Sequence, residues 1–247
     1  MAATLPVRTG NPALQADAFR TARIHAGEDA MTIEGAVNKT ALALLLVVAA
    51  AAWTWSLGPA AGPLVLVGAL GGFVLALATT FKPAWAAVTA PLYAVLEGLA
   101  LGAISRMFEL RYPGLVSQAV FCTFGTLAAM LIAYRAGWVQ ATERFKMGVM
   151  AATGGIALVY LVAMVLALFH VSTPVFGGGG PLGIGISVFV VVVAALNLVL
   201  DFDLIESGAE RGAPKYMEWY AAFALLVTLV WLYLELLRLL SRLQERR

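Results

Sequence analysis

The sequence predicts an all-α integral membrane protein, a bundle of seven transmembrane helices. Composition is the first reason, because 62% of the 247 residues are apolar and only 12% are charged, whereas a typical soluble domain is about 45–50% apolar and about 25% charged. The second reason is that the apolar residues gather into seven long runs. These runs lack the period-two alternation of membrane β-barrel strands, and a helix satisfies its own backbone hydrogen bonds in lipid. We therefore expect the lipid bilayer to surround most of the chain.

The segment before the first apolar run is polar and mixed in charge. It contains the breakers Asn11-Pro12 and Gly27, and it lacks the apolar stretch of a cleaved signal peptide. We predict a cytoplasmic N-terminal tail at residues 1–39, followed by one membrane domain at residues 40–247.

Each of the seven runs is close to the roughly 20 residues that a helix needs to cross about 30 Å of hydrocarbon. Short connections rich in Gly and Pro separate them, which is typical of turns between helices. The predicted membrane helices are 41–57, 63–81, 86–105, 115–134, 148–169, 182–200 and 220–240.

Small residues recur at four-residue spacing in two of these segments. Gly68 precedes Gly72 in the second segment, and Gly98 precedes Gly102 in the third. This spacing lets helix backbones approach closely in lipid. We therefore expect these glycines to serve helix packing rather than ligand binding.

The distribution of positive charge predicts the orientation, because Lys and Arg are retained on the cytoplasmic side of membrane segments. If the segments cross the membrane in alternation, ten of the 16 Lys and Arg residues lie on the side of the N-terminus and six on the other side. We expect a plasma (inner) membrane protein with a cytoplasmic N-terminus, a cytoplasmic 135–147 connection and an outer 177–181 loop. Alternatively the last segment is re-entrant, which would return the C-terminus to the cytoplasm.

The residues that most enzymes and metal sites require are sparse. His25 and His170 lie far apart on opposite predicted sides of the membrane, and Cys122 lies alone within an apolar run. These residues do not supply a histidine-based metal site, a catalytic triad or a disulfide framework. The Lys and Arg residues are not gathered into the basic patch of a nucleic-acid-binding protein. We therefore expect no enzymatic activity, no cofactor and no nucleic-acid partner.

Three carboxyl groups lie within or at the end of apolar segments. Glu97 lies near the middle of the third segment, Asp201 closes the sixth, and Glu235 lies within the seventh. An ionised side chain in lipid costs at least about 2.5–3.5 kcal/mol on insertion scales, so each carboxyl is a candidate functional group. Glu97 must be protonated, paired across helices or exposed to a water-filled cavity. For Glu235 the alternative is an ion pair with Arg238 at i, i+3 spacing.

Two further carboxyls, Asp203 and Glu206, follow Asp201 closely. They are expected at or beyond the cytoplasmic headgroups, where a carboxylate needs no special explanation. We treat them as secondary candidates.

Two motifs in the last two segments resemble those of the transmembrane Bax inhibitor motif family, in its bacterial Bax inhibitor-1/YccA branch. The sixth-helix motif of that family appears here as LDFDLI at 200–205, and the seventh-helix motif as LYLELL at 232–237. The number and length of the segments and the glycine-centred third helix around Gly98 also agree. The resemblance covers the chain from about Ala41 to the C-terminus, leaving the tail outside it.

The resemblance implies a seven-helix fold with the last helix at the centre and a pH-sensitive calcium leak in which two carboxylates share a proton. Carried over by position, these carboxylates are Asp201 and Glu235. The family has Asp at both positions, so Glu235 is a departure that lengthens the side chain by one methylene. The family's basic latch residue near the end of the second helix corresponds at best to Lys82.

Our leading hypothesis is a passive Ca²⁺ pathway that protonation closes. Hard cations take carboxylate and carbonyl oxygens, and we expect Asp201 and Glu235 to bind Ca²⁺ transiently. Whether these two residues meet is open from the sequence, because Asp201 lies near the cytoplasmic end of its helix and Glu235 far along the next; if they do not, Glu97 is the natural partner for one of them. The alternative is a non-transporting regulator that binds another membrane protein, such as a protease.

Overall fold

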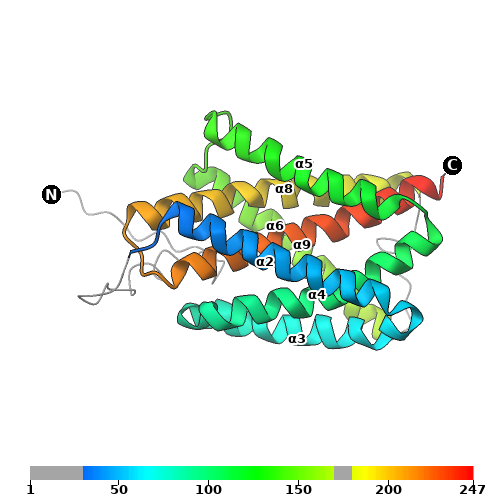
Figure 1. Ribbon diagram of the computed structural model, residues 1–247. Coiled ribbons are helices and arrows are strands. Elements are labelled where there is room, and N and C mark those ends of the chain that lie inside the picture. The colour runs from blue at the N-terminus through cyan, green and yellow to red at the C-terminus, as the bar shows by residue number, and fades with distance from the viewer. Residues whose placement is uncertain (1–29, 170–179, 247) are drawn as a thin grey trace. The chain divides into compact units, whose positions relative to one another are not determined.

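The computed structural model describes residues 30–169 and 180–246. Within them it holds seven helices that are long and apolar enough to cross a membrane, as the sequence predicted (Figure 1). The predicted 177–181 loop, most of the tail and both histidines lie wholly or largely outside the described residues. The helices are α2 (Ile33–Ser56), α3 (Gly62–Phe81), α4 (Ala86–Arg111), α5 (Leu115–Arg135), α6 (Glu143–Leu168), α8 (Pro181–Glu210) and α9 (Met217–Gln244), with the short 3-10 helices η2 (Gly58–Ala61) and η3 (Pro83–Trp85) before α3 and α4.

The first helix begins earlier than hydropathy predicted. Thr32 has extended backbone angles, and its side-chain oxygen accepts a hydrogen bond from the Gly35 amide at 2.9 Å. Such a cap satisfies one of the free amides at a helix N-terminus. Helix α2 therefore starts at Ile33, and the last residues of the predicted tail are helical.

The last two helices also extend past their apolar cores. Helix α8 continues through the polar residues after Asp201 to Glu210, and α9 continues to Gln244. Apolar character shows where a helix is buried in lipid, whereas helical hydrogen bonding continues into the headgroup region. Helix α9 is one uninterrupted helix of 28 residues, about 42 Å long at about 1.5 Å per residue. This length is sufficient to cross the hydrocarbon core of a membrane.

The chain forms two compact units, and α4, α8 and α9 each contribute to both of them. Among the described residues, unit 1 comprises 30–103 together with Asp203–Leu226. Unit 2 comprises 104–169, 180–202 and 227–246.

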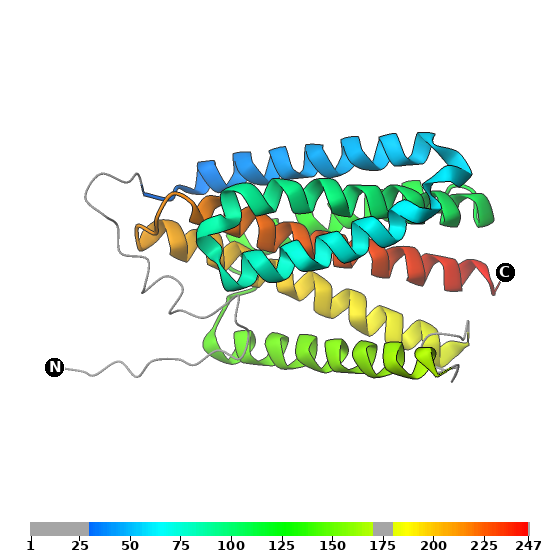
Figure 2. The ribbon, with the colours of Figure 1, turned by 90° about the horizontal axis from the view of Figure 1, so that it is seen from below.

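Close approach of backbones holds the helices of unit 1 together. A Cβ atom at Gly102 would overlap the backbone of Ala51 in α2, and one at Gly68 would overlap the backbone of α4 at Leu96. The predicted packing role of these glycines is therefore confirmed. Helices α3 and α4 lie side by side in both ribbon views (Figures 1 and 2).

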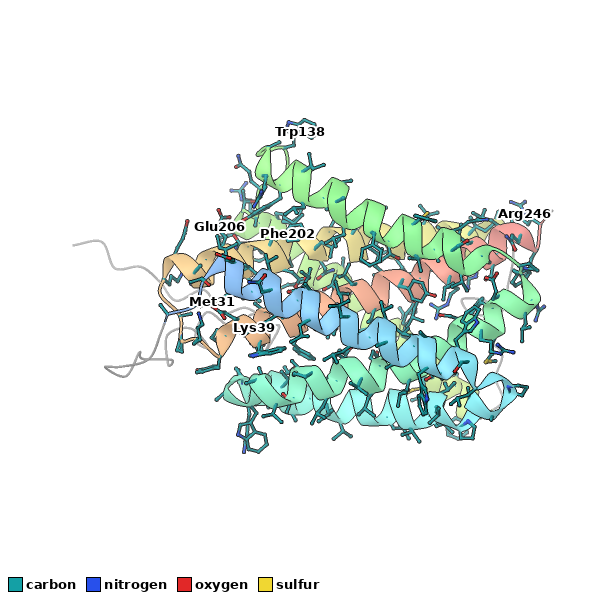
Figure 3. All side chains as sticks on the ribbon, viewed as in Figure 1. Met31, Lys39, Trp138, Phe202, Glu206 and Arg246 are labelled. Carbon is teal, nitrogen blue, oxygen red and sulfur yellow. The ribbon has the colours of Figure 1, made fainter. Side chains whose placement is uncertain are left out.

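Unit 2 has an apolar core between α6 and α8, which lie side by side in Figure 2. Ile156 packs against Val190 and Val193, with Trp231 of α9 against the same cluster. Within the unit, Trp138 after α5 and Arg246 after α9 lie at opposite ends (Figure 3).

Helix α9 is the most enclosed of the seven. In its most apolar 18-residue window 56% of the residues are buried inside the protein, against 17–22% for α2, α3, α5 and α6. This burial is what is expected of the central helix that the resemblance implied.

Candidate functional site

Glu235 lies on the unit 2 portion of α9 and is 2% exposed. Its Oε1 accepts hydrogen bonds from the Tyr160 hydroxyl of α6 at 2.6 Å and from Arg238 Nη1 at 2.8 Å. Arg238 Nη1 also donates to the Tyr160 oxygen at 2.8 Å. The ion pair between Glu235 and Arg238 at i, i+3, which the sequence offered as an alternative, is therefore formed. The other oxygen, Oε2, is buried, and the described residues offer it no hydrogen-bond partner.

Asp201 lies on the unit 2 portion of α8 and is 6% exposed. The hydroxyl of Thr228 on α9 hydrogen-bonds its carboxyl group. Its Oδ2 is buried and, like Oε2 of Glu235, has no partner within the described part of the chain. Each of the two predicted pathway carboxyls thus keeps one oxygen without a donor.

Contacts between α8 and α9 fix how far apart these two carboxyls lie. Asp201 is level with Thr228, and Ser187 is level with Arg242, whose Nη1 lies 2.6 Å from the Ser187 hydroxyl oxygen. The two helices therefore run antiparallel. Glu235 is seven residues beyond Thr228, or about 10 Å along α9 at about 1.5 Å per residue. The structure does not bring the two carboxyl groups into hydrogen-bond contact, and direct sharing of one proton stays a prediction.

Arg242 is a buried cation that the charge count assigned to the outer surface. It is 6% exposed, and its Nη1 donates to the Gly183 carbonyl and the Ser187 hydroxyl, both at 2.6 Å. Arg242 lies one turn beyond Arg238 on the same helix. The core of unit 2 therefore contains a guanidinium as well as carboxylates. The signal in the sequence for this buried Arg242 was Ser187, one of the few polar residues in the apolar run of α8.

Glu97 belongs to unit 1, whereas Asp201 and Glu235 belong to unit 2. Its half-buried carboxyl lies over Gly72 of α3, with Oε2 at 3.0 Å from the position that a Cβ atom of that glycine would take. The hydroxyl of Tyr93, one turn earlier in α4, is 3.4 Å from Oε1. Gly72 therefore gives this carboxyl room against the neighbouring helix.

The secondary candidates belong to unit 1 and differ in exposure. Asp203 is half-buried and Glu206 is exposed, both on the unit 1 portion of α8. Lys82 is exposed and lies over the ring of Trp85, with Nζ at 4.2 Å from the ring centre. Lys82, which the resemblance implied as a latch, thus contacts the Trp85 ring in the described part of the chain.

Glu218, in the first turn of α9, was not among the residues selected from the sequence. Its side chain is fully buried, and it accepts hydrogen bonds from Thr32 and Lys39, while Lys215 lies 3.1 Å away. The only local signal was the i, i+3 spacing of Lys215 and Glu218. The contacts with Thr32 and Lys39 span more than 170 positions in the sequence.

The described residues do not gather the donors of a tight metal site. No group of three or more His, Cys, Asp or Glu side chains that could hold a metal ion occurs in them. A tight Ca²⁺ site takes six to eight oxygen ligands. The oxygens of Asp201 and Glu235 that lack a donor lie at different depths along α8 and α9.

Comparison with known proteins gives one match. The model of a family described as Bax inhibitor 1 like matches residues 11–245. No curated protein and no solved structure matches the chain.

Proposed function

The chain belongs to the Bax inhibitor 1 like family, and from this premise we propose that it is a pH-sensitive passive leak for Ca²⁺. The path follows the unit 2 portions of α8 and α9, where Asp201 and Glu235 are its carboxylates. The protein lies in the plasma membrane with its N-terminus in the cytoplasm. Ca²⁺ and protons are its small partners.

The observation that carries the proposal is the pair of buried carboxyl oxygens without donors, Oδ2 of Asp201 and Oε2 of Glu235. A buried polar atom without a partner costs about 1–3 kcal/mol, and more if it is charged. A fold that needed only packing at these positions is better served by apolar side chains. An unpaired carboxyl oxygen is, however, what binds a proton in one state and a hard cation in another.

The pH response follows from the charges of the two groups. In the described state Glu235 is paired with Arg238, and a proton on Asp201 leaves this ion pair as the charged group of the site. Loss of the Asp201 proton adds a second negative charge about 10 Å from Glu235 along the helix axis, where the two charges repel by about 1–2 kcal/mol at an effective dielectric constant of about 20. Arg238 offsets part of this charge at Glu235. The leak therefore opens as pH rises and closes as pH falls.

The direct test is Ca²⁺ entry into liposomes that contain the purified protein and an internal calcium dye, measured from pH 5 to pH 8. Entry should rise with pH in the wild type. Asp201→Asn should hold entry near its acidic level, while Glu143→Gln, a change at an exposed carboxyl, should leave the profile unaltered. Wild-type liposomes that admit no Ca²⁺ at any pH would refute the leak and favour the non-transporting regulator.

The proposed orientation has a separate test in intact cells. With Cys122 replaced by Ala, a cysteine at Ala60 in η2 should react with a membrane-impermeant thiol reagent. A cysteine at Thr142, in the connection between α5 and α6, should react only after the cells are opened. The reverse pattern would invert the topology.

A further inference from the structure

The most completely satisfied buried carboxylate described here is that of Glu218 in unit 1, which the proposed leak does not use. Its Oε1 accepts from the Thr32 amide at 2.9 Å and from the Thr32 hydroxyl at 3.0 Å, and it lies 3.1 Å from Lys215 Nζ. Its Oε2 is bonded to Lys39 Nζ. The side chain is 0% exposed, whereas those of Lys39 and Lys215 are 20% and 46% exposed. The carboxylate is therefore buried, whereas the side chains of Lys39 and Lys215 are partly exposed to solvent.

Glu218 also binds the N-terminus of α2. Thr32 is the N-cap of that helix, and its amide and hydroxyl donate to the carboxylate while its oxygen accepts from Gly35. A negative charge at this end of a helix is stabilised by the free amides and the helix dipole. A Cβ atom at Gly35 would overlap the Glu218 carboxyl. A glycine at this position thus leaves room for a carboxylate that comes from another helix.

Backbone contacts reinforce the same junction. The Met31 amide donates to the Ala213 carbonyl at 2.6 Å, and Ala30 forms an antiparallel bridge with Pro214. Met31 itself is 2% exposed; Figure 3 labels it beside Lys39 at the start of α2. The chain entering α2 is consequently fastened to the connection between α8 and α9 and to the first turn of α9.

We propose that this junction, the Glu218 clamp (Thr32, Gly35, Lys39, Lys215 and Glu218), is a lock that stabilises the closed state of the leak. The inference rests on the proposed function. In the described state the free oxygens of Asp201 and Glu235 are buried from solvent, so ions do not reach them. Glu218 and Glu235 lie on one continuous helix, α9. Contacts that hold its first turn in place therefore favour this closed state over any state in which α9 moves.

The test combines a structural and a functional measurement in the full-length protein with Cys122 replaced by Ala. A cysteine at Met31 reports opening of the clamp through its rate of maleimide labelling, and liposome Ca²⁺ entry at pH 5.5 reports the closed state. Glu218→Gln should increase the labelling rate about tenfold or more and Ca²⁺ entry several-fold. Glu34→Gln, a change at an exposed carboxyl in the first turn of α2, should change neither.

Two milder variants keep the proposal testable if Glu218→Gln does not fold. Lys39→Met removes one cation and Gly35→Ala displaces the carboxylate, and both should raise labelling and acidic Ca²⁺ entry together. Faster labelling with unaltered Ca²⁺ entry would reduce the clamp to a structural contact and overturn the proposal. Unaltered labelling would overturn it as well. If wild-type liposomes admit no Ca²⁺ at any pH, the proposed function fails and the lock fails with it, while labelling still shows whether the clamp fastens α2.

Discussion

The buried carboxylates of the two units differ in how fully they are hydrogen-bonded, although all are almost inaccessible. In unit 1 both oxygens of Glu218 have donors, including the ammonium of Lys39. In unit 2 Asp201 and Glu235 each keep an oxygen without a donor in the described residues. Burial by itself therefore does not separate these carboxylates, whereas the number of donors on each oxygen does.

The physical reason lies in the cost of an ionised group away from water. Donors and cations around Glu218 replace its lost hydration, so the charge stabilises the contacts that it makes. Asp201 and Glu235 have fewer donors, so hydrogen bonds do not fully offset the cost of placing an ionised carboxyl away from water. The proposed function assigns to these groups the binding of a proton or a cation, either of which would supply the missing partner.

The largest expected difference between the two units is in stability. Glu218→Gln removes a buried charge from its cation and should lower the free energy of unfolding by about 2–4 kcal/mol, since breaking one partner of a buried ion pair costs about 3–5 kcal/mol and Lys39 is partly exposed. Asp201→Asn should cost less than about 1 kcal/mol, because it leaves a neutral group of the same shape. Glu235→Gln should lie between the two, because it breaks the ion pair with Arg238, a cation more exposed than Lys39. Thermal unfolding in detergent measures all three. Equal losses at the three positions would remove the distinction drawn between the units.

The second prediction tests the packing around the Glu218 carboxyl by changing its neighbour Gly35. Gly35→Ala should lower the free energy of unfolding by about 1–3 kcal/mol, the usual cost of inserting an extra methyl into a packed site. Gly154→Ala in α6 is the matched control, because a Cβ atom there meets nothing within 4 Å. It should be neutral or slightly stabilising, since Ala favours helix over Gly.

A double-variant cycle then tests whether Gly35 acts through Glu218. If the overlap is with the carboxyl group, Gly35→Ala should cost much less in a Glu218→Ala background than alone, because contacting residues are not additive. Full additivity in thermal unfolding would show that Gly35 serves the backbone of α2 instead.

The third prediction concerns the coupling between the two carboxyls of unit 2. Asp201→Asn and Glu235→Gln should each flatten the rise of Ca²⁺ entry with pH, by up to about tenfold for a coupling of about 1.4 kcal/mol. Because the response comes from repulsion between the two charges, removing either one should remove it, and the double variant should add little to either single one. A double variant with a clearly flatter profile than both singles would show that the two carboxyls act independently.

The sequence predicted what depends on lipid as solvent. Apolar runs located all seven helices, since a spanning segment must be apolar for about 20 residues. The cost of charge in lipid identified Asp201 and Glu235 as buried carboxyls. The glycine spacing predicted the close packing of α4 in unit 1. These features are local in the sequence, and each follows from a run or a single residue.

The sequence did not predict what depends on distant residues meeting. Glu218 was not selected as a candidate because its partners Thr32 and Lys39 lie at the other end of the chain. Arg242 looked like an outer positive charge because its acceptors, Gly183 and Ser187, lie on another helix. The depth at which α8 and α9 meet was likewise open, and it decides whether Asp201 reaches Glu235.

The smallest expected effect is at Tyr160, whose hydroxyl donates to Oε1 of Glu235. Tyr160→Phe leaves Arg238 as the remaining donor to that oxygen. The Glu235 carboxylate then differs even more from that of Glu218, whose two oxygens both have donors. A hydrogen bond to a charged group contributes about 1.5–3 kcal/mol at most, and Arg238 should recover a large part of it. Ca²⁺ entry at pH 8 should therefore change by less than about twofold, because the ion pair with Arg238 is kept. Tyr233→Phe is the matched control, because it removes a hydroxyl on α9, the helix of Glu235, whose partner is Ser105 at 2.6 Å. A change of about tenfold or more in Tyr160→Phe would show that Arg238 does not compensate for the lost hydroxyl, and an equal change in both variants would show that the effect is not specific to Glu235.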